Sequence, residues 1–180
     1  MSESALYQKL ASSLGLEGLP EESLGTVSAL VVPAASWHAA ALWLKQQGFS
    51  MLIELGAADY SKHPLPHPGR YAVAAHFMAL PGFERACLKA YVPAESPALQ
   101  SLCGLYAAAN WYEREAWDMF GIDFPGHPEL KRILMYEGFE GHPLRKDYPL
   151  GRMQPLIPMR EAVDYEAVRQ AARRAGQGGA

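Results

Sequence analysis

The sequence predicts an α+β fold: a two-layer domain in which a mixed or antiparallel sheet packs on helices, followed by an extended, proline-rich C-terminal segment. Apolar residues in the first 121 positions follow helical and strand periods in turn, as in a packed α+β domain. The 180-residue chain is 49% hydrophobic, so it can bury one core. After Gly121 the apolar residues occur singly or in pairs, and six prolines fall between Pro125 and Pro158. We therefore predict a domain over 1–121 and an extended partner-binding segment over 122–180.

Helical periodicity and end signals predict four helices in the domain. The first places Leu6, Leu10 and Leu14 on one stripe and ends at Gly15. The second covers 35–47, where apolar residues recur at helical spacing ahead of a terminating glycine.

Two more helices are expected before the proline-rich segment. One covers 96–108, because Ser96 can cap it and Pro97 suits its first helical position. The other lies between Asn110 and Gly121, where Asn110 and Glu113 resemble a capping box and glycine supplies a left-handed stop.

Apolar runs with strand composition predict four strands. They cover residues 26–32, 49–55, 70–80 and 84–92. The last two form a hairpin around the Pro81-Gly82 turn, with alternate residues of each arm on one buried face. Residues 62–69 are expected to form a loop because they contain three prolines.

Composition excludes several classes of function. The net charge of −3 argues against nucleic acid as the main partner, although residues 142–180 are mildly basic. Cys87 and Cys103 are too few for a four-thiolate zinc or iron–sulfur site, and a single pair favours a reducing compartment. The N-terminus does not resemble a secretory signal, and no stretch is long and apolar enough to span a membrane.

The densest stretch runs from Asn110 to Leu134, NWYEREAWDMFGIDFPGHPELKRIL. Its helix has Trp111 and Trp117 on opposite flanks of the core stripe, which consists of Tyr112, Ala116, Met119 and Phe120. Large aromatic residues on both flanks are unusual for a surface helix, so we expect this helix to pack on two sides.

Three interpretations of its charged residues remain open. Glu115, Asp118 and His127 could form a metal or acid–base site, although the helix carries no histidine at ligand spacing. Glu113 could simply cap the helix, with Arg114 and Asp118 as a surface pair. The favoured interpretation is a protein interface, in which these charges pair with a partner's charges while the tryptophans fill its pockets.

Four of the six histidines, His63, His67, His127 and His142, precede proline. The residue before a proline is pushed into extended conformation, so loops display these rings. Zinc binding is disfavoured because no cysteine or carboxylate lies at close spacing. We expect hydrogen bonds across a contact instead.

The proline-rich segment is not expected to hold its shape alone. Fixing the backbone costs about 1–2 kcal/mol per residue, whereas burying one Leu-sized side chain returns about 1.5–3 kcal/mol. Its apolar residues are spaced like anchors: Leu144, Tyr148, Leu150, Met153, Leu156, Ile157 and Met159. We expect a neighbouring surface to order it. A basic amphipathic helix can form over 164–175.

A run of motifs spans about forty residues. It consists of Glu113-Arg114-Glu115, Asp118, Met119-Phe120-Gly121-Ile122, His127-Pro128, Lys131-Arg132-Ile133-Leu134 and the sequence GHPLRKDYP over 141–149. This pattern resembles the signature of the thirty-kilodalton subunit family of NADH:quinone oxidoreductase, the respiratory complex I.

The resemblance implies a peripheral-arm subunit on the cytoplasmic side of a bacterial inner membrane, beside the quinone-site and iron–sulfur subunits. Such a chain binds no cofactor and has no catalytic residues, while the complex uses FMN, iron–sulfur clusters and quinone and pumps protons. Membrane contact is then made only through the complex. The residues implied in the partner interface are Trp111, Glu113, Arg114, Glu115, Trp117, Asp118, His127, Lys131, Arg132, His142, Arg145, Lys146, Asp147 and Tyr148.

Two alternatives remain at this point. Similar subunits occur in membrane-bound hydrogenase, formate hydrogenlyase and photosynthetic NADH dehydrogenase-like complexes. A different class is a free-standing metal-dependent enzyme that uses Glu115, Asp118 and His127.

Overall fold

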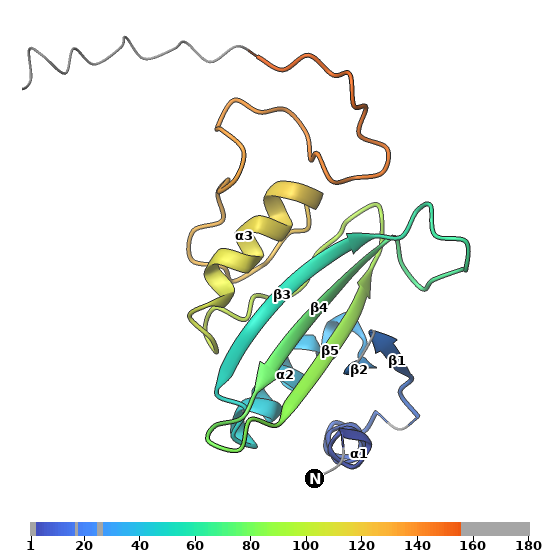
Figure 1. Ribbon diagram of the computed structural model, residues 1–180, viewed down its shortest axis with the longest axis vertical. Helices are drawn as coiled ribbons and strands as arrows, with labels where there is room; N and C mark the ends of the chain where they lie inside the picture. The colour runs from blue at the N-terminus through green and yellow to red at the C-terminus, as the bar shows by residue number, and fades with distance from the viewer. Residues whose placement is uncertain (1–2, 17, 25–26, 156–180) are drawn as a thin grey trace, which may run out of the picture.

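The chain folds as a five-stranded sheet with helices, seen in a computed structural model that describes residues 3–16, 18–24 and 27–155. Figure 1 shows the elements. In chain order they are α1 (Glu3–Ser13), β1 (Glu21–Leu24), β2 (Val27–Val31), the 3-10 turn η1 (Ala34–Ser36), α2 (Trp37–Gln46), β3 (Met51–Asp59), β4 (Tyr71–Met78), β5 (Arg85–Val92) and α3 (Ala109–Phe120).

The sheet is mixed, with strand order β1-β2-β5-β4-β3. Strands β2 and β5 are parallel, and the other neighbouring pairs are antiparallel. The parallel pair arises because α2 and the β3–β4 hairpin intervene between β2 and β5. These features confirm the predicted α+β class.

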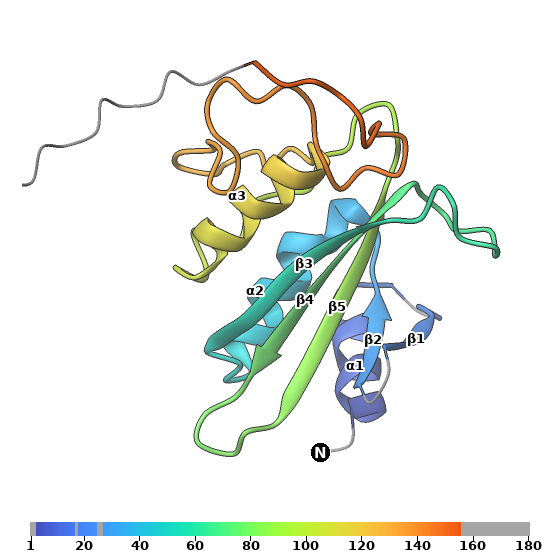
Figure 2. The ribbon, with the colours of Figure 1, turned by 45° about the horizontal axis from the view of Figure 1, so that its top comes forward.

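One face of the sheet is covered by α2, which lies behind the strands in Figure 1 and Figure 2. The predicted apolar stripe of α2 is fully buried: Trp37, Ala40, Ala41 and Leu44. The predicted inner faces of the β4–β5 hairpin are buried as well, except that Ala79, just beyond β4, is only partly buried: Tyr71, Val73, Ala75, Phe77, Ala86, Leu88, Ala90 and Val92. Strand periodicity therefore identified the core correctly.

The N-terminal helix closes the gap where β2 and β5 diverge. Leu6 and Leu10 are buried, as their spacing predicts. The Tyr7 hydroxyl accepts a hydrogen bond from the Cys87 backbone N–H at 2.9 Å and donates one to the Ser28 carbonyl at 2.8 Å. It thereby bridges the two strands where their direct pairing, confined to two residue pairs, ends.

The helix expected over 96–108 is wrong. Leu99, Leu102 and Tyr106 are buried at helical spacing, but the backbone forms turns and makes hydrogen bonds to the chain after α3. Leu99 N–H donates to the Asp123 carbonyl at 3.0 Å and Ser101 N–H to the Pro125 carbonyl at 3.0 Å. Long-range pairing has replaced the local helical ladder.

Strand β1 was not predicted, and β3 continues to Asp59 rather than ending at 55. The continuation contains residues with small side chains, Gly56, Ala57 and Ala58, which pair with residues 72–74 of β4. The loop expected over 62–69 contains no helix or strand. The helix expected over 164–175 lies outside the described residues.

Candidate partner interface

Helix α3 is the element that organises the signature residues. It packs beside the edge strand β3, and the chain that follows it runs along another side of the helix and past its end (Figures 1 and 2). The predicted stop is confirmed, because Gly121 adopts the left-handed conformation with φ 70° and ψ 33°. The predicted capping box is wrong: the helix begins at Ala109, Ala108 is the N-cap, and no side chain caps it.

The Glu113 carboxylate holds the preceding loop instead of the helix end. It is fully buried and accepts hydrogen bonds from Ser101 Oγ at 2.6 Å, the Leu102 backbone N–H at 2.6 Å and Cys103 Sγ at 3.4 Å. Burial raises the pKa of Glu113, and these hydrogen bonds only partly oppose that rise. Glu113 therefore fixes the irregular 97–108 stretch to α3.

Asp118 holds the chain on the other side of α3. Its carboxylate is fully buried and pairs with Arg132, and Oδ2 accepts three backbone hydrogen bonds from Ile133, Leu134 and Met135 at 3.1, 2.9 and 2.8 Å. Burial alone would raise the pKa of Asp118, but these N–H groups and the guanidinium hold it below its ordinary value. The Arg114–Asp118 surface pair is therefore wrong.

Two arginines bind carbonyl groups of the same segment. Arg114 donates from Nε to the Lys131 carbonyl at 3.1 Å and from Nη2 to the Arg132 carbonyl at 3.0 Å. Its guanidinium also lies 5.1 Å from the ring centre of Trp111. Arg132 in turn donates to the carbonyls of Phe139 at 2.7 Å and Gly141 at 3.1 Å.

The C-terminal end of α3 is capped by the GHPLRKDYP motif. The free carbonyls of the last turn accept bonds from His142 Nδ1, the Leu144 N–H and Arg145 Nε. Burial lowers the pKa of His142, although its bond to the Asp118 carbonyl acts in the opposite direction. A positive guanidinium at this end is also favoured by the helix dipole.

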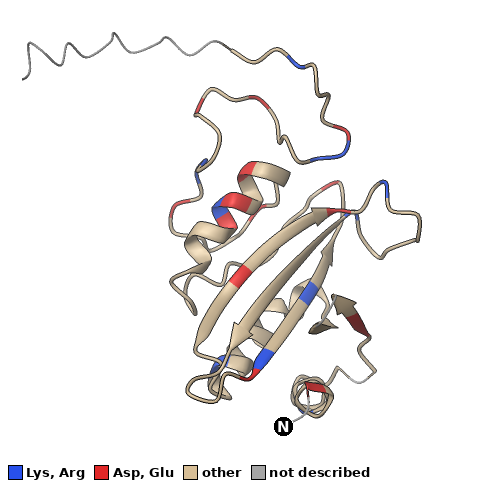
Figure 3. Cartoon of the chain, viewed as in Figure 1, with Lys and Arg blue, Asp and Glu red and all other residues tan. Residues whose placement is uncertain are grey.

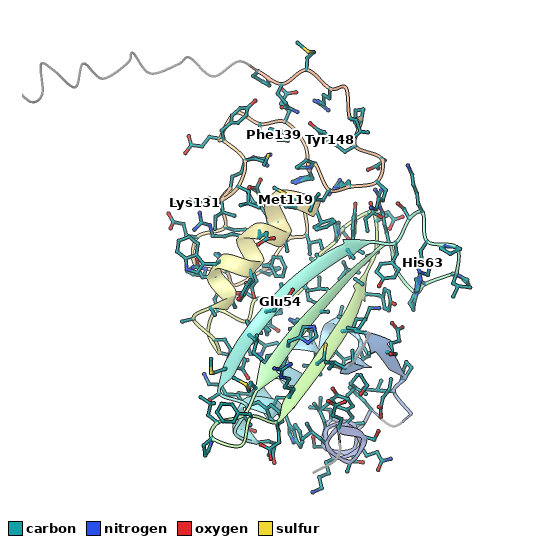
Figure 4. All side chains as sticks on the ribbon, viewed as in Figure 1. Glu54, His63, Met119, Lys131, Phe139 and Tyr148 are labelled. Carbon is teal, nitrogen blue, oxygen red and sulfur yellow. The ribbon has the colours of Figure 1, made fainter. Side chains whose placement is uncertain are left out.

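The same motif is tied to the sheet through a pair of residues at the β3–β4 loop. Arg70 pairs with Asp59 at 3.0 Å and with Asp147 at 2.8 Å, and Asp59 accepts the Lys146 N–H at 2.8 Å. Tyr148 stacks on Phe139 with ring centroids 6.1 Å apart, and Figure 4 labels both residues in the chain around α3. Residues 122–155, which we call the clamped segment, are thus held at several points by their own domain.

The apolar anchors of this region divide into two groups. Ile122 and Phe124 are buried in the core. Others on α3 or the clamped segment are exposed, with exposed fractions of 60% for Trp111, 56% for Leu134, 50% for Leu144, 104% for Leu150 and 88% for Met153. We call these five residues the exposed apolar set. Apolar side chains of this size are the ones that a protein contact buries where they gather into one patch.

The structure separates the fourteen expected interface residues into three groups. Some direct their polar groups to their own chain: Glu113, Arg114, Asp118, His127, Arg132, His142 and Arg145. The exposed residues are Trp111, Glu115, Lys131, Lys146 and Asp147, and of these Asp147 also pairs with Arg70. Figure 3 shows acidic and basic residues on α3 and on the clamped segment. Trp117 and Tyr148 are half-buried.

Sequence reasoning missed Asp59, Arg70 and Ser101. No local pattern marks them, since Asp59 meets Lys146 across 87 positions of sequence. The feature that singles out Asp59 is the burial of its carboxylate at the end of β3, and only the folded structure reveals that burial.

Among the described residues, one group of three metal-ligating side chains lies within 4.8 Å: Cys103, Glu113 and His127. All three side chains already take part in hydrogen bonds within the chain. His127 Nδ1 accepts the Glu129 N–H at 3.0 Å, so Nε2 carries the proton and donates to the Asn110 carbonyl at 3.2 Å. Burial also raises the pKa of Cys103 to about 11, against the thiolate that a metal needs. This group fits a hydrogen-bonded junction better than a metal site.

The alternative site of Glu115, Asp118 and His127 is not formed. In the described part of the chain these three side chains are not gathered, because Glu115 is exposed while Asp118 is enclosed by the clamped segment. Within that same part, none of the helices has the length and apolar character to cross a bilayer.

Comparison with known proteins gives a consistent result. The family model of the respiratory-chain NADH dehydrogenase 30 kDa subunit matches residues 30–154. NADH-quinone oxidoreductase subunit 5 of Thermus thermophilus is 41% identical over 147 residues, which cover 78% of this chain and 71% of that protein. The corresponding NADH-quinone oxidoreductase subunit of Bordetella avium is 38% identical over 179 residues, which cover 91% of this chain and 86% of that one.

Two solved structures share the fold. A trypsin-resistant fragment (1-134) of Nqo5 has a TM-score of 0.61 and 32% identity, covering 68% of this chain and 98% of the fragment. A chain of an archaeal membrane-bound sulfane sulfur reductase has a TM-score of 0.67 and 19% identity, covering 89% and 96% of the two chains. The second shows the fold alone. On the family match and these identities, the chain belongs to the 30 kDa subunit family of respiratory-chain NADH dehydrogenase, which is complex I.

Proposed function

We propose that this chain is a structural subunit of the peripheral arm of a proton-translocating NADH:quinone oxidoreductase. It docks beside the quinone-site and iron–sulfur subunits on the cytoplasmic side of the membrane and supports electron transfer from NADH to quinone. FMN, iron–sulfur clusters and quinone belong to the other subunits, and this chain holds none of them. Relatives that are named as subunits of NADH-quinone oxidoreductase support this proposal.

One observation carries the proposal. The buried charges of the signature bind the backbone of the clamped segment, while the exposed apolar set remains in solvent. Holding an irregular backbone with charged groups costs desolvation, which the apolar side chains of that segment do not offset by burial within the chain. The arrangement is understandable if the signature shapes a surface and a partner protein covers its apolar side chains.

The nature of the exposed groups indicates the kind of partner. Trp111 and Leu134 offer apolar contacts, and Glu115 and Lys131 on the same two elements offer charges of both signs (Figure 4 labels Lys131). Such a mixture suits a protein surface with apolar pockets and a charged rim. The solved Nqo5 chain is a trypsin-resistant fragment (1-134), which supports a stable body for this fold.

The test substitutes exposed apolar residues of this chain and expresses each variant in cells that make the whole complex. We expect Trp111→Ala combined with Leu134→Ser to lower the amount of assembled complex and its NADH:quinone reductase activity several-fold in membranes, with little change in the urea midpoint of the isolated chain. Leu65→Ser combined with Phe83→Ser is the matched control, since both residues are similarly exposed, at 65% and 66%, on loops away from α3. Equal assembly by the two double variants would refute the docking surface.

A further inference from the structure

A pair of histidines far from α3 forms a second polar cluster. His63 and His67 lie in the loop between β3 and β4, which projects from the sheet on the side away from α3; Figure 4 labels His63. Nδ1 of His63 lies 2.8 Å from Nε2 of His67. The ring centroids are 4.5 Å apart, with an angle of 69° between the ring planes.

The protonation of His67 follows from its neighbours. The Tyr91 hydroxyl lies 3.1 and 3.0 Å from the two carboxylate oxygens of Glu22. Burial opposes ionisation of Glu22, but Lys89 and Tyr91 hold its pKa below the ordinary value, so Glu22 only accepts. The single Tyr91 proton therefore goes to Glu22, and the Tyr91 oxygen accepts Nδ1–H of His67 at 3.1 Å. This leaves the lone pair of neutral His67 on Nε2, facing His63.

His63 also directs a lone pair, that of Nδ1, toward Nε2 of His67. The backbone N–H of Leu65 is directed at His63 Nδ1 at 3.2 Å, which requires an acceptor there. The Leu65 carbonyl lies near the same nitrogen at 3.4 Å, so neither contact is close. Two ring nitrogens with facing lone pairs at 2.8 Å repel one another unless a proton or a metal ion lies between them.

The geometry of the pair resembles that of two imidazoles on one ion. Nitrogens bound at about 2.0–2.1 Å with a right angle at the metal lie about 2.9 Å apart, and their ring centres about 4.5 Å apart. An in-line hydrogen bond between two imidazoles would separate the ring centres by about 5 Å. The observed 2.8 Å and 4.5 Å match the shared-ion arrangement, which departs from the wider tetrahedral angle that zinc prefers.

The surroundings supply what a histidine ligand needs. Metal-bound histidines usually donate their second N–H to a group that fixes the tautomer, and His67 does so through Tyr91 to Glu22. Lys89, a neighbouring cation, is neutralised by its pair with Glu22 at 2.5 Å. Three prolines in residues 62–69 restrict the loop that carries both rings.

We propose that His63 and His67 form a binding site for one divalent late first-row transition ion that accepts right-angle coordination, namely Cu²⁺ or Ni²⁺, with water at the remaining positions. Tyr91 is a positioning residue in this site. The proposal is independent of the docking function, because the two regions share no residue.

The experiment uses the full chain, purified without a histidine tag and freed of metal. Isothermal titration at pH 7.5 with Ni²⁺, and separately with Cu²⁺, should show one ion per chain, and His63→Gln or His67→Gln should weaken binding at least tenfold. The control His38→Gln, in α2, should bind as the wild type does. Tyr91→Phe should bind more weakly, and ¹⁵N NMR of its imidazole rings should show that His67 no longer holds a single Nδ1–H tautomer.

Two outcomes overturn the proposal. One is no stoichiometric Ni²⁺ or Cu²⁺ binding by the wild-type chain. The other is equal binding by the wild type, His67→Gln and His38→Gln, which would assign the ion to a site elsewhere on the chain.

Discussion

Asp118 in α3 and Arg132 in the clamped segment form an ion pair in which the carboxylate is fully buried and the guanidinium side chain is 15% exposed. The pair joins residues fourteen positions apart and is completed by backbone N–H groups on one side and backbone carbonyls on the other. A segment without helix or strand is therefore organised around two opposite charges. This supplements the limited apolar burial of the segment, which includes Ile122 and Phe124.

Asp118→Asn should destabilise the isolated chain by about 3 kcal/mol, because it leaves the Arg132 charge unpaired and replaces one of the two accepting carboxylate oxygens with an NH2 donor. The unfolding free energy in urea, measured at pH 7, tests this. Glu115→Gln on the exposed side of the same helix is the control and should change stability by less than about 0.5 kcal/mol. An Asp118→Asn protein with wild-type stability would show that the pair is not stabilising.

The two buried carboxylates should give opposite dependences on pH. The pKa of Asp118 is lowered in the fold, so its stabilisation is present above the unfolded value of about 3.9 and is lost as pH falls through the folded value. The deficit of Asp118→Asn relative to wild type should therefore shrink in acid. Urea unfolding of both proteins between about pH 2.5 and 7 measures it.

Glu113 has a raised pKa, so the fold disfavours its ionised form. Wild-type stability should fall, relative to Glu113→Gln, as pH rises from the unfolded value of about 4.3 through the folded value. The same titration from about pH 4 to 8 tests this slope. If the stability difference between wild type and Glu113→Gln changed with pH in the same direction as the difference between wild type and Asp118→Asn, the raised pKa of Glu113 would be contradicted.

Gly121→Ala should displace the clamped segment. A Cβ at this position would collide with Arg145 Nη2 and lie 2.5 Å from His142 Nε2, and the backbone φ of +70° already disfavours a side chain. We expect a loss of about 1–3 kcal/mol. Gly104→Ala is the control, because nothing lies within 4 Å of its added Cβ. Equal midpoints of Gly121→Ala and Gly104→Ala in thermal unfolding would argue against close packing of Arg145 and His142 on Gly121.

Limited trypsin digestion should separate the strongly held part of the clamped segment from its end. Arg132 is nearly buried in its pair with Asp118, whereas Arg152 is 41% exposed and pairs with exposed Glu140. In the isolated chain, cleavage after Arg152 should therefore precede cleavage after Arg132. In the assembled complex both sites should be protected if the proposed docking is correct. Mass spectrometry of the timed fragments distinguishes these cases.

Local patterns predicted much of the domain. The stripe of α2, the buried inner-face residues of β4 and β5 and the stop at Gly121 depend on residues a few positions apart, and all three are confirmed. The helix expected over 96–108 failed because Leu99 and Ser101 make their backbone bonds to residues after α3. These long-range bonds also position Ser101 and Leu102, which are the hydrogen-bond partners of Glu113.

The sequence by itself determined the fold class, most of the core and the membership of the family, because periodicity and motif spacing are local properties. Tertiary structure alone decided which signature charges face inward. Asp118 and Glu113 find their partners in chain segments whose position depends on the whole fold, and no spacing rule reports that. The sequence does not report whether a charged side chain faces the interior or the solvent. The backbone groups that the fold places beside that side chain decide it.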